Sequence, residues 1–237
     1  MEIDKDRIER VVAEVLKKIK TLSDSSGQPL GVFPDVDSAV AAAREAHLKF
    51  LAGTLETRKR AVEEIRRVIL ENLETLSVLA VEETGFGRSE DKVVKNRLAA
   101  EMTPGTEDLE PLSYTNDHGL TLVERAPYGV IGAIAPSTNP TETIVNNGIS
   151  MIAGGNSVVF NPHPAAKGVS IYTVGLINQA VLKAGGPANL VTTVSEPSLS
   201  SATELMGHPG VNLVVVTGGP ADRKSTRLNS SHGKLTR

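Results

Sequence analysis

The sequence predicts an α/β fold in which several helices precede a parallel sheet. Its length of 237 residues is sufficient for one large domain. Apolar residues recur with helical spacing up to residue 101, whereas short apolar runs alternate with helical ones from residue 120 onwards. Strands that alternate with helices through short connections form βαβ units, and such units build parallel sheets with right-handed crossovers.

Composition favours an aliphatic core and excludes several classes of protein. Hydrophobic residues make up 40% of the chain and aromatic residues 3%, with neither Trp nor Cys. The absence of Cys excludes a disulfide scaffold and a thiolate metal site, and we predict no metal. No apolar run reaches the roughly 18–20 residues that span a bilayer, and the charges that begin at Glu2 argue against a secretory signal. We expect a cytoplasmic protein that binds neither nucleic acid nor membrane.

The sequence predicts that the first residues form a unit separate from the rest of the chain. Residues 1–20 have the pattern of an amphipathic helix, and residues 21–34, with Ser, Gly and Pro, predict a linker. A helix on a tether is suited to lay its apolar face on a partner. The alternative is a helix that packs on its own domain or frays in solution. The apolar face consists of Ile3, Ile8, Val11, Val12, Val15, Leu16 and Ile19.

Helices are expected before the first strand. They cover residues 39–51, 56–81 and 89–101. Either Asp35 or Asp37 is the expected N-cap of the first, and Gly85 is expected to stop the second. Glu82 and Glu83 precede that glycine and suggest a catalytic carboxylate pair, but adjacent helical residues point about 100° apart. We interpret them as a solvated helix end.

Alternating strands and helices are expected in the second half of the chain. The predicted strands are residues 120–125, 129–135, 157–160, 190–194 and 211–216, and the predicted helices are residues 141–153, 165–184 and 199–206. Ligands of parallel sheets bind outside the carboxyl ends of the strands. Three loops rich in polar residues, Pro and Gly fall at such ends, at residues 136–140, 161–164 and 217–220. The sequence therefore predicts a ligand site at this edge.

Residues 222–237 differ in charge from the rest of the chain. They hold five Lys or Arg and one acid, a net charge of +4, whereas the other 221 residues hold 20 basic and 27 acidic residues, a net of −7. Such a basic end is also found in nucleic-acid-binding tails. Because it lacks apolar periodicity, we interpret it as a non-native tail and exclude it from the fold.

The run Ala126-Pro-Tyr-Gly-Val-Ile-Gly-Ala-Ile-Ala-Pro-Ser-Thr-Asn-Pro-Thr-Glu-Thr143 resembles the oxyanion loop of the aldehyde dehydrogenase superfamily. Its Thr-Asn-Pro-Thr-Glu form is most similar to the CoA-acylating propionaldehyde and acetaldehyde dehydrogenases of bacterial microcompartments. The resemblance covers residues 35–221 and implies the N-terminal part of an aldehyde dehydrogenase domain, with a Rossmann-like, NAD- and CoA-binding parallel sheet.

Asn139 is the candidate catalytic residue of that loop. Its side-chain NH2 is able to stabilise the negative oxygen that forms when a nucleophile adds to an aldehyde. An Asn before Pro is also a common turn former, and spacing alone does not separate the two roles. The resemblance favours the oxyanion donor. Thr138 stands where the commoner superfamily form has Trp, as in the acylating branch.

The resemblance also implies a set of cofactor contacts. The residues that precede Asn139, and the Asn-Pro-His loop that resembles the ribose-contacting loop, are candidates; most superfamily members have Lys in place of Asn161. Thr-Gly-Gly after the last strand resembles the turn where pyrophosphate meets a helix N-terminus. A GxGxxG fingerprint is absent. The candidates are Pro136, Ser137, Thr138, Asn161, Pro162, His163, Thr217, Gly218 and Gly219.

The implied function is that of a truncated enzyme. Members of the family attack an aldehyde with a cysteine thiolate, pass hydride to NAD and transfer the acyl group to coenzyme A, but this chain has no cysteine. The resemblance further implies that residues 1–20 bind a microcompartment shell protein, that the enzyme lies in the microcompartment lumen, and that the full-length parent is a homo-oligomer. The alternative is a non-catalytic nucleotide-binding or shell-binding module.

Overall fold

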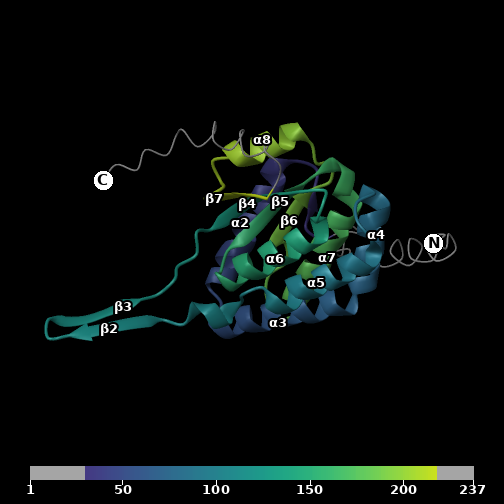
Figure 1. Ribbon diagram of the computed structural model, residues 1–237. Coiled ribbons are helices and arrows are strands. Elements are labelled where there is room, and N and C mark those ends of the chain that lie inside the picture. Colours follow the sequence, from purple (N-terminus) through teal and green to yellow (C-terminus); the bar gives the residue numbers. More distant parts are fainter. Residues whose placement is uncertain (1–29, 218–237) are drawn as a thin grey trace.

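A five-stranded sheet forms the centre of the molecule. The computed structural model describes residues 30–217. The sheet has the order β1-β6-β5-β4-β7, and every pair of neighbours is parallel. Helices cover both faces (Figure 1), so the predicted α/β fold with a parallel sheet is confirmed. The strands are β1 Val32–Phe33, β4 Val130–Ala135, β5 Ser157–Pro162, β6 Val191–Val194 and β7 Leu213–Val216.

The larger core lies between one face of the sheet and a double layer of helices. Side chains of β4 alternate between the faces, so Ile131 and Ala133 point into this core while Val130 and Ile134 point into the other. Burial of an Ile side chain contributes about 2 kcal/mol, so the aliphatic interior is a major stabilising term. The helices are α3 Leu55–Glu71, α4 Leu73–Thr84, α5 Ser89–Met102, α6 Pro140–Ala153 and α7 Lys167–Lys183.

The opposite face is covered by α2 Val36–Leu51 and α8 Leu199–Gly207. Asp35 is the N-cap of α2, since its Oδ1 accepts from the Ser38 N–H over 2.7 Å. Asp37 lies in the first helical turn, so of the two predicted caps only Asp35 is confirmed. Ser198 caps α8 through a reciprocal capping box with Ser201.

The helix predicted over residues 56–81 is in fact two helices that break at Asn72. The Asn72 backbone leaves the helical region, at φ −115° and ψ 14°. Its Nδ2 donates to the Val68 carbonyl over 2.7 Å, and its Oδ1 accepts from Tyr172 Oη over 3.2 Å. The side chain thereby competes with the backbone hydrogen bonds of a continuous helix. The stop at Gly85 is confirmed, with φ 70°.

Two elements differ from the prediction because they depend on strand pairing. The predicted strand 120–125 is β3 Gly119–Val123, which pairs antiparallel with the unpredicted β2 Leu112–Asn116 in a hairpin that projects from the body (Figure 1). Val32 and Phe33 of β1 lie within the predicted linker 21–34 and pair with β6, so the linker prediction is wrong at that end.

The other predicted strands and helices occur within a few residues of their expected bounds, apart from the start of the 165–184 helix, which is the 3-10 helix η2 Pro164–Ala166. The predicted targeting helix 1–20 and the tail 222–237 lie outside the described residues. Among residues 30–217, no helix is long and apolar enough to cross a membrane.

Candidate active site

Three polar segments meet at the carboxyl edge of the sheet. Because β4, β5 and β7 are parallel neighbours, their carboxyl ends lie side by side, with Ala135 opposite Pro162 and Ile134 opposite Val216. The backbone N–H of His163 donates to Ala135 O over 3.0 Å, and that of Thr217 donates to Ile134 O over 3.1 Å. The structure thus brings together the segments that follow β4 and β5 and, of the predicted loop at residues 217–220, Thr217.

The strand order reverses at this edge. The chain runs from β4 through β5 to β6 in one direction and then returns to place β7 on the other side of β4. The crevice outside the carboxyl ends at such a reversal is where open parallel sheets bind ligands. The Pro136–Asn139 segment follows β4 and Thr217 follows β7, so both lie at the point of reversal. Sequence patterning alone did not reveal the strand order.

The Asn139 amide has a free donor here. Asn139 holds the N-cap position of α6, with φ −138° and ψ 63°, but its side chain does not cap the helix. Lys95 Nζ donates to Asn139 Oδ1 over 3.2 Å. Within residues 30–217, the amide NH2 has no hydrogen-bond partner. This donor is therefore open to a ligand, at a helix end where the dipole favours negative charge.

A buried ion pair lies behind the loop. Lys92 of α5 is 2% exposed, and its Nζ donates to the Thr138 carbonyl oxygen over 2.9 Å. The same Nζ lies 3.6 Å from Glu142 Oε1 in the first turn of α6. Sequence reasoning missed Lys92 and Glu142. The sequence carries no signal for them, since Lys92, Asn96 and Ala100 share one buried face of α5 only in the structure.

Asn161 has a structural partner of its own. The predicted loop at residues 161–164 starts later, because β5 extends to Pro162. Asn161 is 3% exposed; its Oδ1 accepts from Ser201 Oγ over 2.7 Å and its Nδ2 donates to Ser198 O over 3.3 Å. Its side chain therefore ties β5 to the N-terminus of α8. His163 is exposed, and its Nδ1 accepts from Ala165 N over 3.1 Å.

The remaining candidates lie along the same edge. Pro136 and Ser137 are half-buried and Thr138 is exposed. Thr217 is exposed, and its Oγ1 donates to Ile134 O over 3.0 Å. Gly218 and Gly219 lie outside the described residues. In the part of the chain that the structure describes, no group of three or more His, Asp or Glu is placed to hold a metal ion.

Glu82 and Glu83 do not form a catalytic pair at this site. The Glu83 carboxylate accepts from the backbone N–H groups of Gly168 and Val169, over 2.6 and 2.7 Å, and so caps α7. Partial burial raises the pKa of Glu82 above its ordinary value. Both glutamates are exposed, as expected for a solvated helix end, and Glu83 in addition caps α7, whose start only the tertiary structure brings to it.

The sequence profile described as the aldehyde dehydrogenase family matches residues 13–231. The chain belongs to the aldehyde dehydrogenase family. It is 49% identical over 228 residues to the acetaldehyde dehydrogenase (acetylating) EutE of Salmonella typhimurium, covering 94% of this chain and 48% of the relative. It is 41% identical over 213 residues to the propanal dehydrogenase (CoA-propanoylating) of Citrobacter freundii, covering 90% of this chain and 46% of the relative.

Solved structures give the same family. The propionaldehyde dehydrogenase of Rhodopseudomonas palustris with bound CoA and an acylated cysteine matches with a TM-score of 0.82 and 53% identity, over 84% of this chain and 46% of that one. A propionaldehyde dehydrogenase from the fucose utilisation microcompartment of Clostridium phytofermentans matches with a TM-score of 0.82, 48% identity and the same coverage. This aldehyde dehydrogenase chain spans about half the length of these relatives, as the resemblance implied.

Proposed function

We propose that this chain is part of an NAD-dependent, CoA-acylating aldehyde dehydrogenase that oxidises a short aliphatic aldehyde, propionaldehyde or acetaldehyde, to its acyl-CoA. The observation that carries the proposal is the unpartnered side-chain NH2 of Asn139 at the carboxyl edge of the sheet, where the strand order reverses between β4 and β7. The names of the acetylating and CoA-propanoylating relatives support the substrate class and the acyl acceptor.

Asn139 is the proposed oxyanion donor. When a thiolate adds to an aldehyde carbon, the carbonyl oxygen becomes an anion, and a preorganised donor at about 2.7–3.1 Å stabilises it. The chain has no cysteine, so the thiolate has to come from another part of the full-length protein. An acylated cysteine in the Rhodopseudomonas palustris relative supports this assignment. The net reaction converts aldehyde, NAD+ and CoA thiol into thioester, NADH and a proton.

The proposed place for an extended polar nucleotide is the carboxyl edge of the sheet. Thr138, His163 and Thr217 are exposed along it, and NAD+ bound there would supply the hydride acceptor. Because Asn161 is buried and bonded to α8, we assign the ribose contact to His163 and the backbone beside it. Gly218 and Gly219 remain the proposed pyrophosphate turn. CoA would occupy the same edge, since its thiol has to reach the same carbonyl carbon.

Steady-state turnover of the full-length protein tests the proposal. Asn139→Ala is expected to lower kcat by about 10²–10³-fold, measured as NADH formed with propionaldehyde or acetaldehyde and CoA. Asn146→Ala is the matched control, because Asn146 is exposed on the same helix and bonds Thr103 Oγ1. Full turnover by the Asn139 variant would remove Asn139 from the site. NADH production by the 237-residue chain alone would contradict the need for an external thiolate.

Residues 1–20 are proposed to bind a microcompartment shell protein, which would place the enzyme in the lumen. Support comes from the apolar face of the sequence pattern and from a structural relative that belongs to a microcompartment. Fused to a fluorescent protein in shell-producing cells, residues 1–20 should give puncta. Replacement of Val12 and Leu16 by Asp should abolish them, and uniform fluorescence from the unaltered fusion would exclude shell binding.

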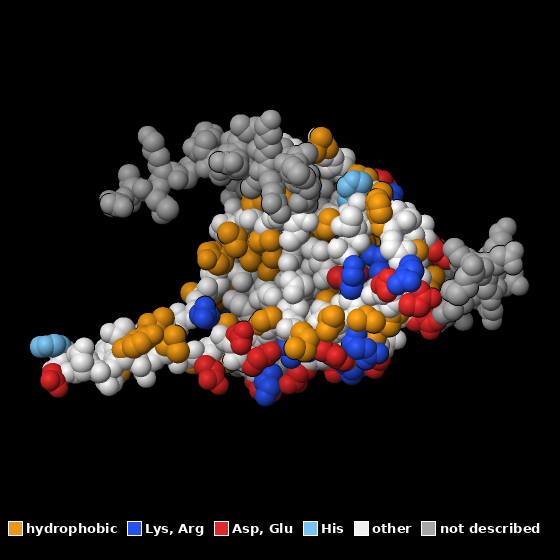
Figure 2. All heavy atoms as spheres, viewed as in Figure 1, with side chains coloured by type: hydrophobic (Ala, Val, Ile, Leu, Met, Phe, Trp, Pro, Cys, Tyr) orange, Lys and Arg blue, Asp and Glu red, His pale blue; other side chains and the backbone are white. Residues whose placement is uncertain are grey.

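Homo-oligomer formation by the full-length protein is proposed through the β2–β3 hairpin. Figure 2 shows apolar side chains gathered along the projecting hairpin. The strand register places Leu112, Tyr114 and Val123 on one face of the hairpin and Leu120 and Leu122 on the other, and exposed apolar residues gathered in this way are typical of protein interfaces. Leu120→Asp with Leu122→Asp should lower the mass measured by light scattering; an unchanged mass would exclude the hairpin as the contact. The exposed apolar residues are Leu112, Tyr114, Leu120, Leu122 and Val123.

A non-catalytic nucleotide-binding or shell-binding module is the second candidate function. The observation that favours it is the complete absence of cysteine. The reading frame that follows codon 220 in the source DNA separates the candidates. Continuation into a cysteine-containing half, as in relatives twice as long, supports the enzyme, whereas a true stop after a native end supports the module.

A further inference from the structure

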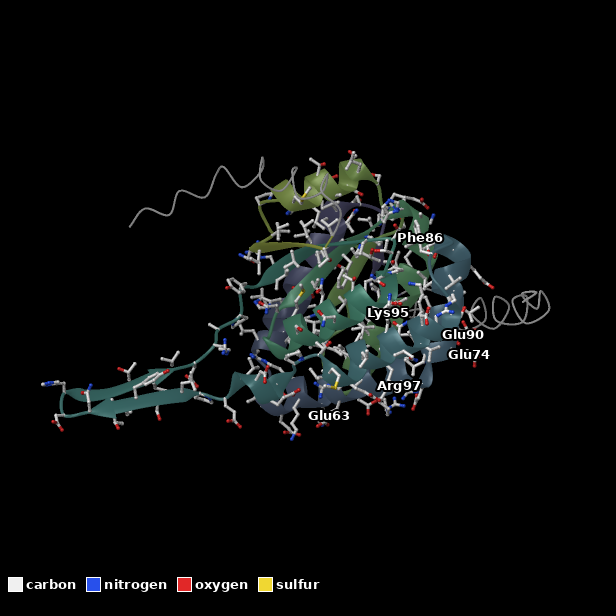
Figure 3. The ribbon with its side chains drawn as sticks, viewed as in Figure 1. Glu63, Glu74, Phe86, Glu90, Lys95 and Arg97 are labelled. Carbon is white, nitrogen blue, oxygen red and sulfur yellow. The ribbon has the colours of Figure 1, made fainter. Side chains whose placement is uncertain are left out.

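Two lysines of α5 hold the segment that carries Asn139. Lys92 Nζ donates to the Thr138 carbonyl over 2.9 Å, and Lys95 Nζ donates to Asn139 Oδ1 over 3.2 Å. Residues three apart lie on the same side of a helix, so both side chains reach one short segment from a single rigid element. Lys95 is labelled on α5 in Figure 3.

The Lys92 contact is poorly explained as a stabilising ion pair. Lys92 and Glu142 are almost fully buried, at 2% and 8% exposure, yet their closest atoms are 3.6 Å apart. Glu142 Oε1 has no hydrogen-bond partner in the described part of the chain, while Oε2 accepts from Thr141 Oγ1. Apolar replacement of a buried ion pair is often neutral or stabilising. What the lysine adds is a fixed hydrogen bond to the carbonyl of Thr138.

That carbonyl belongs to the peptide group that joins Thr138 to Asn139. A donor on it restricts rotation of the peptide plane, and with it the direction in which the Asn139 side chain leaves the backbone. Lys95 then holds the amide oxygen, which leaves the NH2 group as the free donor of the side chain. One contact acts on the peptide group that precedes Asn139 and the other on its side-chain amide, and together they restrict the orientation of the donor.

We propose that Lys92 and Lys95 are positioning residues that orient the Asn139 amide for the developing oxyanion. The proposal rests on the proposed function of Asn139 as oxyanion donor. Neither lysine touches substrate in this assignment; each acts through the Thr138–Asn139 segment. A misplacement of about 1 Å in a catalytic group costs on the order of 10²-fold in rate, which sets the expected effect of losing either contact.

The test is a kinetic comparison in the full-length enzyme. Lys95→Met removes an exposed contact, and Lys92→Met combined with Glu142→Gln removes both buried charges so that neither is left unpaired. We expect kcat to fall by about 10²-fold with little change in the KM for aldehyde. Glu142→Gln alone is the reference for the double variant. Arg97→Met is the matched control, because Arg97 is exposed on α5 and pairs with Glu101 (labelled Arg97 in Figure 3).

Combination with Asn139→Ala distinguishes positioning from a general structural effect. If the lysines act through Asn139, their replacement in that background should lower kcat by no more than about 2-fold. The inference is overturned if the lysine variants lose the same factor in kcat with Asn139 present and with Asn139→Ala. It is also overturned if kcat is unchanged in both lysine variants. In either case Asn139 keeps its role. Full turnover by Asn139→Ala alone overturns the proposed function instead. If the variant with Lys92→Met and Glu142→Gln does not fold, the comparison of Lys95→Met with and without Asn139→Ala decides the question.

Discussion

The carboxylate of Glu83, the penultimate residue of α4, lies against the backbone of Gly168 at the start of α7. Its Oε1 accepts from the Gly168 N–H over 2.6 Å, and its Oε2 accepts from the N–H of Val169 over 2.7 Å. The first N–H groups of a helix have no partner within it. A residue 85 positions away in the sequence therefore caps α7, the helix that follows β5 of the candidate active site.

Replacement of Glu83 by Ala should destabilise the chain. The two N–H groups lose their acceptor and the negative charge at the helix N-terminus disappears, which together cost about 1 kcal/mol in free energy of unfolding. Urea denaturation of the purified chain measures this value. Glu82→Ala is the control, because Glu82 has no such contact and its raised pKa reflects burial alone. Equal losses in the two variants would contradict the capping assignment.

Gly129→Ala should be strongly destabilising, because Gly129 leads into β4 with φ +119°. A Cβ at this position would lie 2.4 Å from Asn212 Oδ1, the atom that accepts from the Val130 N–H. Backbone strain of this kind costs about 1–3 kcal/mol, and a disturbed Asn212 contact adds to it. Thermal unfolding should show a clear drop in Tm.

The matched control for that variant is Gly207→Ala at the end of α8. A Cβ on Gly207 meets no atom within 4 Å, and Ala is the better helix former by up to about 1 kcal/mol. The Tm should therefore stay the same or rise. A drop as large as that of the Gly129 variant would show that backbone strain is not the cause at residue 129.

Asn161→Ala should reduce stability rather than only nucleotide affinity. The change removes the acceptor for Ser201 Oγ and the donor to Ser198 O inside the protein, a loss of about 1–3 kcal/mol for buried polar groups left without partners. Urea denaturation should separate it from His163→Ala, which changes an exposed side chain and should stay within about 0.5 kcal/mol. If the Asn161 variant were fully stable and bound nucleotide more weakly, the ribose contact would be assigned to Asn161 again.

His47 should make the stability depend on pH. Burial lowers the pKa of His47 below its ordinary value of 6.5, and the charge of Arg58 lowers it further, against a raising contribution from the Gly155 backbone. Because the unfolded state then binds the proton more readily, the associated stability is complete above pH 6.5 and is lost as the pH falls towards the lower folded-state pKa.

Urea midpoints measured between pH 7.5 and 5 would show this loss, and His47→Gln should flatten the curve in that window. His163→Gln is the control, because His163 is exposed. An unchanged slope in the His47 variant would assign the pH dependence to other groups.

Much of the architecture follows from local patterns in the sequence. The change from helical to strand period near residue 120, the cap at Asp35 and the stop at Gly85 depend on residues within a few positions of one another, and the structure has all three. Parallel pairing follows from the alternation of strands and helices. The location of the Asn139 loop at the carboxyl edge follows in turn, because every parallel strand ends at the same edge.

Other features arise only from contacts between distant residues. Asn72 breaks a helix because Tyr172, 100 residues later, holds its side chain, and β1 becomes a strand because β6 lies beside it. The sequence around Lys92 predicts an ordinary helix-surface residue. In the structure α5 packs on α6, and Lys92 is buried under Thr138, 46 residues away. The sequence by itself therefore determined the family, the sheet and the identity of the oxyanion candidate. Only the tertiary structure decided how Asn139 is held, since its orientation depends on groups that no local pattern brings together.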